Sequence, residues 1–333
     1  MPSLKLSDFD YTLPSELIAQ TPIEPRDHSR LLVVHKDTQQ FEHKQFFQIG
    51  DYLQAGDVLV INTSKVIKAR LHGTKPTGGA VEIFLLTPQT NRRWECLVRG
   101  KPQAGAVITM TETAHATMVQ KTADDTWLVD FDHDDITQFG EVPLPPYIKP
   151  EQSAQQFEAR YQTVYADQAG SVAAPTAGLH FTTELLAALQ AKGVVVAPVT
   201  LHVGLGTFAS VKTEDITAHQ MHAEYAMLPE ATAQAIVTAK ANGKKVIAVG
   251  TTSCRTLEAM HGKAGEGWVN IYMYPGYQFN TVDALITNFH LPKTTLFMLV
   301  SALAGMDVIK QAYAEAIKER YRFFSFGDAM LIM

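Results

Sequence analysis

The chain has 333 residues, 46% of them hydrophobic and 19% charged, which is enough for one large domain or two ordinary ones. Its net charge of -6 excludes a protein coated in basic charge, although a local basic face stays possible. Two cysteines, Cys96 and Cys254, are too few for a disulfide framework or a zinc knuckle. No apolar run reaches the roughly 20 residues of a membrane helix, and the N-terminus lacks the apolar core of a signal peptide. We therefore expect a cytoplasmic protein without a membrane segment and, since no stripe demands a partner, a monomer.

Residues 1–64 combine a short helical piece with two strand-like runs. The helical piece is "PSELIAQ", and the runs are "RLLVVHK" and "DVLVINT". A strand as apolar as "DVLVINT" needs cover on both faces. We expect it to share a sheet with strands from later in the chain.

From residue 65 to 149 the pattern changes to short alternating segments punctuated by Gly, Pro, Asn and Asp. They are "KARLHG", "AVEIFLL", "WECLVRG", "AVITMT", "HATMVQK" and "TWLVDFD". This spacing predicts a small antiparallel β-barrel or sandwich, and the proline cluster "EVPLPPYIKP" a stiff connector after it. Basic residues gather in two groups, which could grip a nucleic-acid backbone or form an ordinary solvated face: Lys65, Lys68, Arg70 and Lys75, and Arg92, Arg93, Arg99 and Lys101.

After residue 150 helical and strand-like segments alternate. The helices are "TTELLAALQAKG", "EATAQAIVTAKANG", "LFMLVSALAG" and "VIKQAYAEAIKERY", and the strands are "VVVAPVTLHV", "KKVIAVG", "DALITNF" and "RFFSFGDAMLI". Such alternation predicts a mostly parallel sheet with flanking helices. The sequence therefore predicts an α/β domain of residues 1–64 and 150–333, interrupted by an inserted antiparallel β-barrel of residues 65–149.

In α/β sheets function gathers at the carboxyl ends of the strands, and the first unusual loop there is "LHVGLGTFASV". Gly204, Gly206 and Ala209 match the spacing of a dinucleotide fingerprint, and Glu224 follows Gly204 by 20 residues. No full helix is expected after these glycines, which favours plain tight-turn glycines. An NAD-dependent oxidoreductase stays open as an alternative function.

Two further loops carry polar residues. In "VIAVGTTSCRTLE" a buried strand meets a helix, so Thr251, Thr252 and Ser253 either bind an anion or cap the helix. Cys254 lacks a nearby histidine, which favours a packing role. The loop "TNFHLPKTTLFML" presents Asn288, His290 and Lys293, which indicates a polar site modestly more than a solvated loop. Thr294 or Thr295 can cap the helix that follows.

The C-terminal stretch "ERYRFFSFGDAML" interleaves arginines with rings: Arg320 and Arg322 alternate with Tyr321, Phe323, Phe324 and Phe326. Such a pattern suits splayed RNA bases, although phenylalanines in a closing strand are usually core. A noncatalytic RNA-binding module is thus a second alternative. Near the start, Arg26, Asp27 and Arg30 form either a surface ion-pair set or an anion contact.

The group His219, His222 and Glu224 in "AHQMHAE" lacks a metal-site pattern, so no metal is expected.

Seven long blocks together resemble one family. They are "FDYTLPSELIAQTPIEPRDHSRLL", "YQTVYADQAGSVAAPTAGLHFT", "VTLHVGLGTF", "HAEYAMLP", "AVGTTSCRTLE", "DALITNFHLPKTTLFMLVSALAG" and "YRFFSFGDAMLI". They are similar to the S-adenosylmethionine:tRNA ribosyltransferase-isomerases of the queuosine pathway. The resemblance runs from about residue 4 to 332 and is weakest in the inserted β block.

The resemblance implies a two-domain fold and an activity. The family moves the ribosyl part of S-adenosylmethionine onto the aminomethyl group of a 7-deazaguanine base (preQ1) at the tRNA wobble position. The product is epoxyqueuosine, with adenine and methionine released. S-adenosylmethionine is consumed as a substrate, so no cofactor is expected, and the tRNA that carries preQ1 is the partner.

The chemistry needs a base near the sulfonium, because the sulfonium acidifies the adjacent ribose carbon, and an acid near the departing adenine. His180, His202, His290 and Asp328 are the catalytic candidates, with Glu224 as a further carboxylate. In "APTAGLHFT" small residues would let the substrate approach the backbone, Pro175 would stiffen the wall, and Thr182 or Thr183 would cap the next helix. The substrate-binding candidates are Arg26, Asp27, Arg30, Pro175, Thr176, Ala177, Gly178, Phe181, Gly204, Gly206, Thr207, Phe208, Thr251, Thr252, Ser253, Arg255, Asn288, Phe289, Lys293, Arg322 and Phe324.

The chain departs from the family pattern in "INTSKVIKARL". Thr63 stands where the family has an acid and Lys65 where it has an arginine, whose bidentate fork lysine lacks. A role for position 63 is therefore in doubt, and Lys65 is expected to be peripheral. Cys254 also stands where a small apolar residue is usual, which argues against catalysis by its thiol.

Overall fold

The computed structural model describes residues 4–89, 92–123, 125–143, 147–148, 158–204, 211 and 213–333. It divides into two compact units. One unit, the α/β unit, comprises residues 1–65, 149–168 and 174–333, and the barrel unit comprises residues 66–148 and 169–173. Two short strands that pair with each other, β4 (Ser64–Val66) and β11 (Gln168–Ser171), carry the chain across these boundaries.

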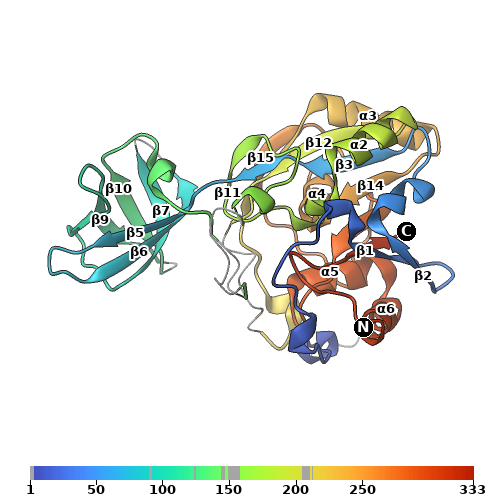
Figure 1. The fold of residues 1–333 in the computed structure, drawn as a ribbon, viewed down its shortest axis with the longest axis horizontal. Helices are drawn as coiled ribbons and strands as arrows, with labels where there is room; N and C mark the ends of the chain where they lie inside the picture. Colours follow the sequence, from blue (N-terminus) through green and yellow to red (C-terminus); the bar gives the residue numbers. More distant parts are fainter. Residues whose placement is uncertain are drawn as a thin grey trace. The chain divides into compact units, whose positions relative to one another are not determined.

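The α/β unit is built on a nine-stranded sheet (Figure 1). Its spatial order is β15 (Gly265–Val269), β13 (Glu224–Leu228), β12 (Val195–Leu201), β3 (Val58–Asn62), β14 (Val246–Val249), β16 (Ala284–Asn288), β17 (Ala329–Ile332), β1 (Arg30–His35) and β2 (Gln40–Gln45). The central strands β12, β3, β14 and β16 are parallel to one another. The strand β17 is antiparallel to β16 but parallel to β1, and β2, β13 and β15 join the sheet antiparallel.

The α/β class is confirmed, but the prediction of a mostly parallel sheet is wrong, because the sheet is mixed. The direction of β17 escaped prediction because a strand buried on both faces reads as the same apolar run in either direction. The strands β2, β13 and β15 were not predicted at all. The residues of β2 and β15 are mostly polar or exposed, and β13 buries only alternate residues.

Alternate residues of the central strands serve two separate hydrophobic cores. Val58 and Val60 of β3 face one core, and Leu59 and Ile61 face the other. The first core is covered by α3 (Glu230–Ala241), α4 (Gly250–Ala259), α5 (Thr295–Ala304) and α6 (Met306–Lys318). The second is covered by the 3-10 helices η4 (Phe46–Tyr52) and η6 (Thr176–His180) and by α2 (Thr183–Ala191). Both faces are thus covered, as "DVLVINT" required.

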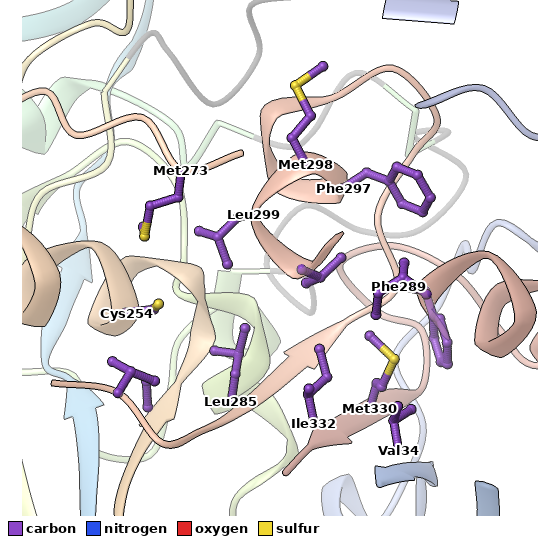
Figure 2. Packing of buried hydrophobic residues seen from close by; sticks show 14 of the residues in the cluster. Val34, Cys254, Met273, Leu285, Phe289, Phe297, Met298, Leu299, Met330 and Ile332 are labelled. Atoms are coloured by element: carbon purple, nitrogen blue, oxygen red, sulfur yellow. The ribbon is translucent and has the colours of Figure 1, made fainter. Parts of the chain in front are cut away.

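Figure 2 shows the first core, where the sulfur of Cys254 points from α4 into an apolar cluster with Met273 and Leu285. Cys254 is fully buried, and burial raises the pKa of its thiol. A buried neutral thiol is not a nucleophile. The packing role predicted for Cys254 is confirmed.

Helix ends follow the sequence signals. Thr182 caps α2, since its Oγ1 accepts a hydrogen bond from the Leu185 amide at 3.1 Å, and Gly193 ends the turn after the helix at φ +93°. Thr294 caps α5 in the same way. Two predictions were too long: "PSELIAQ" forms only the 3-10 turn η2 (Ser15–Leu17), and the closing strand begins at Ala329.

The barrel unit is a closed six-stranded antiparallel barrel, as predicted (Figure 1). Its order is β10 (Trp127–Phe131), β7 (Arg93–Arg99), β6 (Ala80–Pro88), β5 (Arg70–Thr74), β8 (Val107–Thr109) and β9 (His115–Lys121). Inward side chains such as Ile83, Leu85 and Met118 fill it. Half of the proline cluster predicted as a stiff connector, residues 144–146, 149 and 150, lies outside the described residues.

Within the described ranges, no single helix has the length and hydropathy of a membrane span. The helices α5 and α6 have that length and hydropathy only when they are taken together, and the chain bends by 114° between them.

Candidate active site

The topology brings the predicted site residues to one edge of the sheet. The parallel strands β12 and β16 end at this edge, so His202 and Asn288 lie there. Because Asn288 pairs with Ala329 and Ala329 with Leu31, the strands β17 and β1 start at the same edge. Asp328 and Arg30 therefore join it, and Glu224, at the start of β13, joins it beside β12.

His180 is held on both sides of its ring. Its Nδ1 lies 2.7 Å from Ser29 Oγ, and its Nε2 lies 3.1 Å from Asn288 Nδ2. Asn288 Nδ2 also donates to the carbonyl of Phe324, which fixes the amide, so Nε2 accepts and Nδ1–H donates to Ser29. Burial, followed by the charge of Arg322, lowers the pKa of His180 to about 3. The neutral ring stacks on Phe46, and this arrangement positions the loop rather than offering a free base.

His290 is equally buried. Its Nε2 lies 2.9 Å from Thr287 Oγ1, and its amide donates to the Tyr313 hydroxyl at 2.9 Å. The carbonyl of His290 accepts from Tyr11. Burial lowers the pKa of His290 to about 3. These bonds tie the loop after β16 to α6 and to the N-terminal segment.

His202 differs from both, because it is only partly buried. Its Nδ1 lies 2.8 Å from Ser64 Oγ, and its ring stacks on Tyr225 with centroids 6.0 Å apart and planes at 19°. Its Nε2 has no hydrogen-bond partner within the described part of the chain. Burial lowers the pKa of His202 below its usual value. When Nδ1–H donates to Ser64, Nε2 presents the lone pair that a general base needs.

Asp328 is 1% exposed and fully engaged. Its Oδ1 accepts from the amide of Arg30 at 2.9 Å, and its Oδ2 accepts from the amide of Arg322 at 2.8 Å. The Arg30 guanidinium lies 3.4 Å from Oδ2 and stacks over Tyr321 at 4.0 Å. Asp328 thus joins the starts of β1 and β17 to the loop before β17.

Glu224 and Arg255 form a buried ion pair beside the end of β12. Glu224 Oε2 accepts from Arg255 Nη1, and Oε1 accepts from the amide of Gly204 at 3.0 Å. The strand that carries Glu224 is antiparallel to β12, whereas a dinucleotide fold places its acid on a parallel strand. The NAD alternative is therefore not supported. The predicted residues Gly206, Thr207, Phe208 and Ala209 lie outside the described residues.

The small residues of η6 are explained by close approach. A Cβ on Gly178 would lie 2.0 Å from the Tyr165 hydroxyl, so only glycine fits there. Pro175 precedes the turn and accepts from the Gly178 amide at 2.8 Å. A Cβ on Gly250, at the start of α4, would lie 3.6 Å from Ala177, so the same turn also lies against α4.

Unpartnered polar atoms collect around η6. They are buried and have no hydrogen-bond partner among the described residues: Thr163 Oγ1, Tyr165 Oη, Thr252 Oγ1 and Asn288 Oδ1. Buried polar atoms normally find partners, so these four atoms are candidates for hydrogen bonds to a ligand.

His180 also lines a small open pocket. Its lining also includes Pro22, Arg26, Arg160 and Phe326. Arg26 donates to the carbonyl of Gln162 at 2.7 Å, so its guanidinium supports the pocket wall.

Several other candidates have structural contacts. Phe181 and Phe289 are fully buried in the cores, and Ser253 Oγ donates to the Val249 carbonyl at 2.8 Å. Lys293 pairs with Asp10 at 2.7 Å, and Asp27 with His28 at 3.0 Å. Thr176 and Thr251 are partly buried in η6 and in the first turn of α4.

The predicted stacking rings at the C-terminus are mostly core. Tyr321 and Phe323 are 0% exposed and Phe326 is 4% exposed, which excludes base stacking on their faces. Phe324 is partly exposed, at φ +76°. Arg322 donates to the carbonyls of Thr21 and Phe326, which fixes this loop.

Acids on the barrel offset part of its two basic groups. Arg92 Nε lies 2.5 Å from Asp134, and Arg93 makes a bidentate pair with Asp130 at 2.6 and 2.7 Å. Arg70 and Arg99 flank Glu82 at 3.7 and 3.5 Å. Arg92 and Arg93 are therefore engaged, which weakens the phosphate-gripping interpretation for them.

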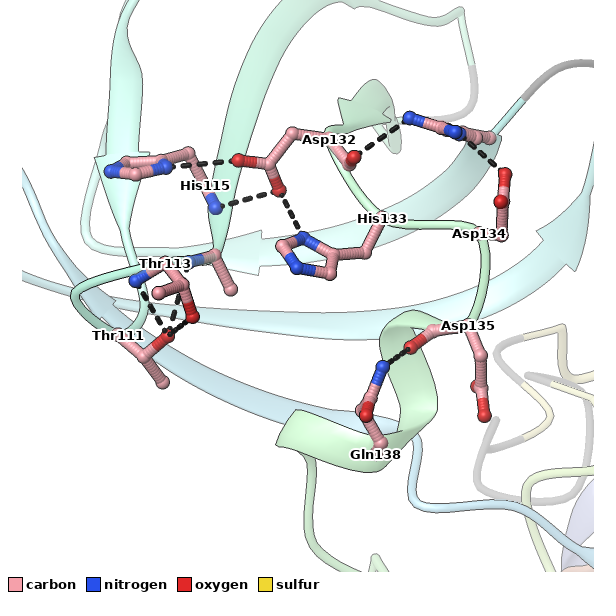
Figure 3. Close-up of polar contacts among 10 residues, drawn as sticks. Thr111, Thr113, His115, Asp132, His133, Asp134, Asp135 and Gln138 are labelled. Atoms are coloured by element: carbon pink, nitrogen blue, oxygen red, sulfur yellow. Dashed lines mark hydrogen bonds and ion pairs between the residues drawn. The ribbon is translucent and has the colours of Figure 1, made fainter.

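Figure 3 shows Asp132 of the barrel between His115 and His133. Burial acts to raise the pKa of Asp132, but hydrogen bonds from the His115 amide and both imidazoles outweigh it and hold the pKa well below its usual value. A carboxylate whose pKa is lower in the folded than in the unfolded state stabilises the protein above the unfolded pKa of about 3.9. This stabilisation is lost as the pH falls toward the folded-state pKa. Below about pH 4 we expect the stability of the barrel to fall less steeply with pH in Asp132→Asn than in the wild-type protein. Thermal unfolding between pH 3 and 7 tests this, and an unchanged acid slope would contradict it.

Within the described ranges, no group of three or more His, Cys, Asp or Glu side chains is arranged to hold a metal ion.

Sequence reasoning missed the residues that orient the histidines. Ser29 and Ser64 are ordinary serines in sequence, and only the fold places them against His180 and His202. Tyr165 and Thr163 fall inside the block "YQTVYADQ". The resemblance of this block to the family was the one feature of the sequence that pointed to them.

Comparison with known proteins agrees with this geometry. Residues 6–332 match the family model described as queuosine biosynthesis protein. An S-adenosylmethionine:tRNA ribosyltransferase-isomerase of Thermotoga maritima is 49% identical over 99% of this chain and 100% of its own length. One of Pelotomaculum thermopropionicum is 52% identical with the same coverage. The crystal structure of the S-adenosylmethionine tRNA ribosyltransferase from Thermotoga maritima superposes with a TM-score of 0.57 and 39% identity over 98% of this chain and 100% of that one. The chain therefore belongs to the queuosine biosynthesis protein family, like these S-adenosylmethionine:tRNA ribosyltransferase-isomerases.

Proposed function

We propose that this protein transfers and isomerises the ribosyl part of S-adenosylmethionine onto the 7-aminomethyl-7-deazaguanine wobble base of tRNA. The product is epoxyqueuosine, with adenine and methionine released. The observation that carries the assignment is the group of unpartnered buried polar atoms around η6, in a chain about half identical to such enzymes. A polyfunctional ligand such as S-adenosylmethionine can complete several of these bonds at once.

His202 is the strongest candidate for the base. The sulfonium acidifies the ribose carbon next to sulfur, and the proton there must go to a group whose lone pair is free. His202 Nε2 is such a group, whereas both nitrogens of His180 are bonded within the protein. Ser64 would orient the ring, and the lowered pKa of His202 keeps it neutral near pH 7. His180 and Asn288 would then position the η6 wall.

The remaining parts of the proposal follow from the same chemistry. S-adenosylmethionine is consumed as a substrate, so the reaction calls for no separate cofactor. The tRNA that carries preQ1 is the macromolecular partner. We further propose that the protein acts as a cytoplasmic monomer.

A release assay tests the function. Purified protein is mixed with S-adenosylmethionine and tRNA that carries the preQ1 base, and free adenine and methionine are followed by chromatography. We expect equimolar release of both, only with the modified tRNA. The control is the same tRNA with unmodified guanine at the wobble position.

Other outcomes have definite meanings. Tight binding of the tRNA without release of adenine and methionine would contradict the enzyme assignment and indicate a noncatalytic RNA-binding module. Release of adenine with unmodified tRNA would instead indicate a hydrolase.

A further inference from the structure

Arg255 carries a pair of hydrogen-bond donors that nothing else in the site uses. It extends from α4 and is 7% exposed. Its Nη1 donates to Glu224, but its Nε and Nη2 are buried and have no partner within the part of the chain that the structure describes. A buried guanidinium normally satisfies its donors.

The two open donors have a specific shape. In a planar guanidinium Nε–H and the Nη2–H beside it point the same way and are spaced like the two oxygens of a carboxylate. Glu224 takes the other side of the group, through Nη1. The open side of Arg255 therefore presents two parallel N–H donors that can bind one carboxylate in a bidentate manner, and we call this pair the fork.

The surroundings of the fork also favour an anion. Arg255 lies in the second turn of α4, a helix of 10 residues whose first turn offers free backbone N–H groups and the positive end of the helix dipole. Thr252 Oγ1, in that first turn, is also buried and unpartnered. Gly250 brings the start of α4 against Ala177 of η6, so these groups adjoin the candidate active site.

We propose that Arg255 Nε and Nη2 bind the methionyl carboxylate of S-adenosylmethionine, an inference that rests on the proposed function. The carboxylate is the only anionic group of this substrate. Glu224 already balances the charge of Arg255, so a bound carboxylate leaves one negative charge, which the sulfonium and ammonium groups of the same ligand offset. A buried fork suits a small terminal group better than the continuous phosphate backbone of tRNA.

The test compares S-adenosylmethionine with its decarboxylated analogue by calorimetry, without tRNA. We expect the wild-type protein to bind S-adenosylmethionine about 100-fold more tightly, as expected for charged hydrogen bonds lost with the carboxylate. Arg255→Lys keeps the charge but removes the fork. It should weaken S-adenosylmethionine binding by a similar factor, yet change binding of the analogue less than about threefold. Arg93→Lys, on the barrel, is the matched control and should leave both affinities unchanged.

Equal affinity of the wild-type protein for the two compounds, or equal loss of both affinities in Arg255→Lys, would overturn the proposal. Weaker tRNA binding by Arg255→Lys, with S-adenosylmethionine affinity kept, would assign the fork to a phosphate instead. The wild-type comparison needs no variant, so it decides the matter even if Arg255→Lys unfolds. Failure of the proposed function has a different signature, the absence of adenine and methionine release from wild-type protein.

Discussion

Replacing His202 with glutamine should lower kcat by about 100- to 10,000-fold, the usual worth of a general base. The reason is geometric, since Nε2 of this half-buried ring has no partner in the described part of the chain while Ser64 holds Nδ1. Adenine release under saturating substrates measures the effect. Thermal unfolding of the variant should stay close to that of the wild-type protein, because the ring is only partly buried.

The pH profile of kcat/KM gives an independent readout. The base works only when neutral, and burial places the pKa of His202 below its usual value near 6.5. Activity should therefore hold as pH falls to about 6.5 and decline only below it, and the His202→Gln variant should lose this limb.

His35→Gln is the matched control, because His35 lies at the other end of β1 from Arg30 and pairs with Glu42. It should leave kcat unchanged. A large loss of kcat in His180→Gln, with His202→Gln near wild type, would transfer the role of the base to His180.

Replacing Glu258 with glutamine should destabilise the α/β unit by about 3 kcal/mol, because a fully buried acceptor of four hydrogen bonds loses half of its capacity. Oε1 accepts from the amides of Thr281 and Val282 at 2.9 and 2.8 Å, and Oε2 from the amide of Asn280 at 3.0 Å and the hydroxyl of Tyr277 at 3.2 Å. A glutamine NH₂ would face backbone N–H groups that have no other acceptor among the described residues. Scanning calorimetry measures the change.

Glu184→Gln is the control, since Glu184 is exposed in the first turn of α2. It should change stability by less than about 0.5 kcal/mol. Hydrogen exchange adds a local readout, because the amides of residues 280–282 should exchange faster in Glu258→Gln only. Equal unfolding temperatures for the two variants would show that Glu258 does not clamp the segment before β16.

The elements that could be predicted are those with strong periodicity. The central strand β3 and the helices α2, α3, α5 and α6 were read from apolar pattern, caps and glycine stops, because these signals are local. The edge strand β15 and its neighbour β13 were missed, since "GEGWV" and "EYAML" gain their pairing from neighbouring strands rather than from a continuous buried run. Whether a strand pairs with a neighbour cannot be predicted from the residues of that strand alone.

The candidate site divides in the same way. The histidines at positions 180, 202 and 290 were proposed from the sequence, because they follow strand-like or small-residue runs at places where loops carry function. Their ranking was not accessible, since it depends on which ring nitrogen is occupied. Ser29 reaches His180 across 151 residues of chain, and Ser64 reaches His202 across 138.

By itself the sequence determined the α/β class, the inserted barrel and the family, because these depend on periodicity and on long ordered blocks of residues. The tertiary structure alone decided which polar atoms are satisfied. Arg255, Glu224 and Gly204 meet only because β13 runs antiparallel to β12 beneath α4. Whether a buried donor has a partner depends on distances of a few ångströms between segments far apart in the chain, and no local pattern encodes such distances.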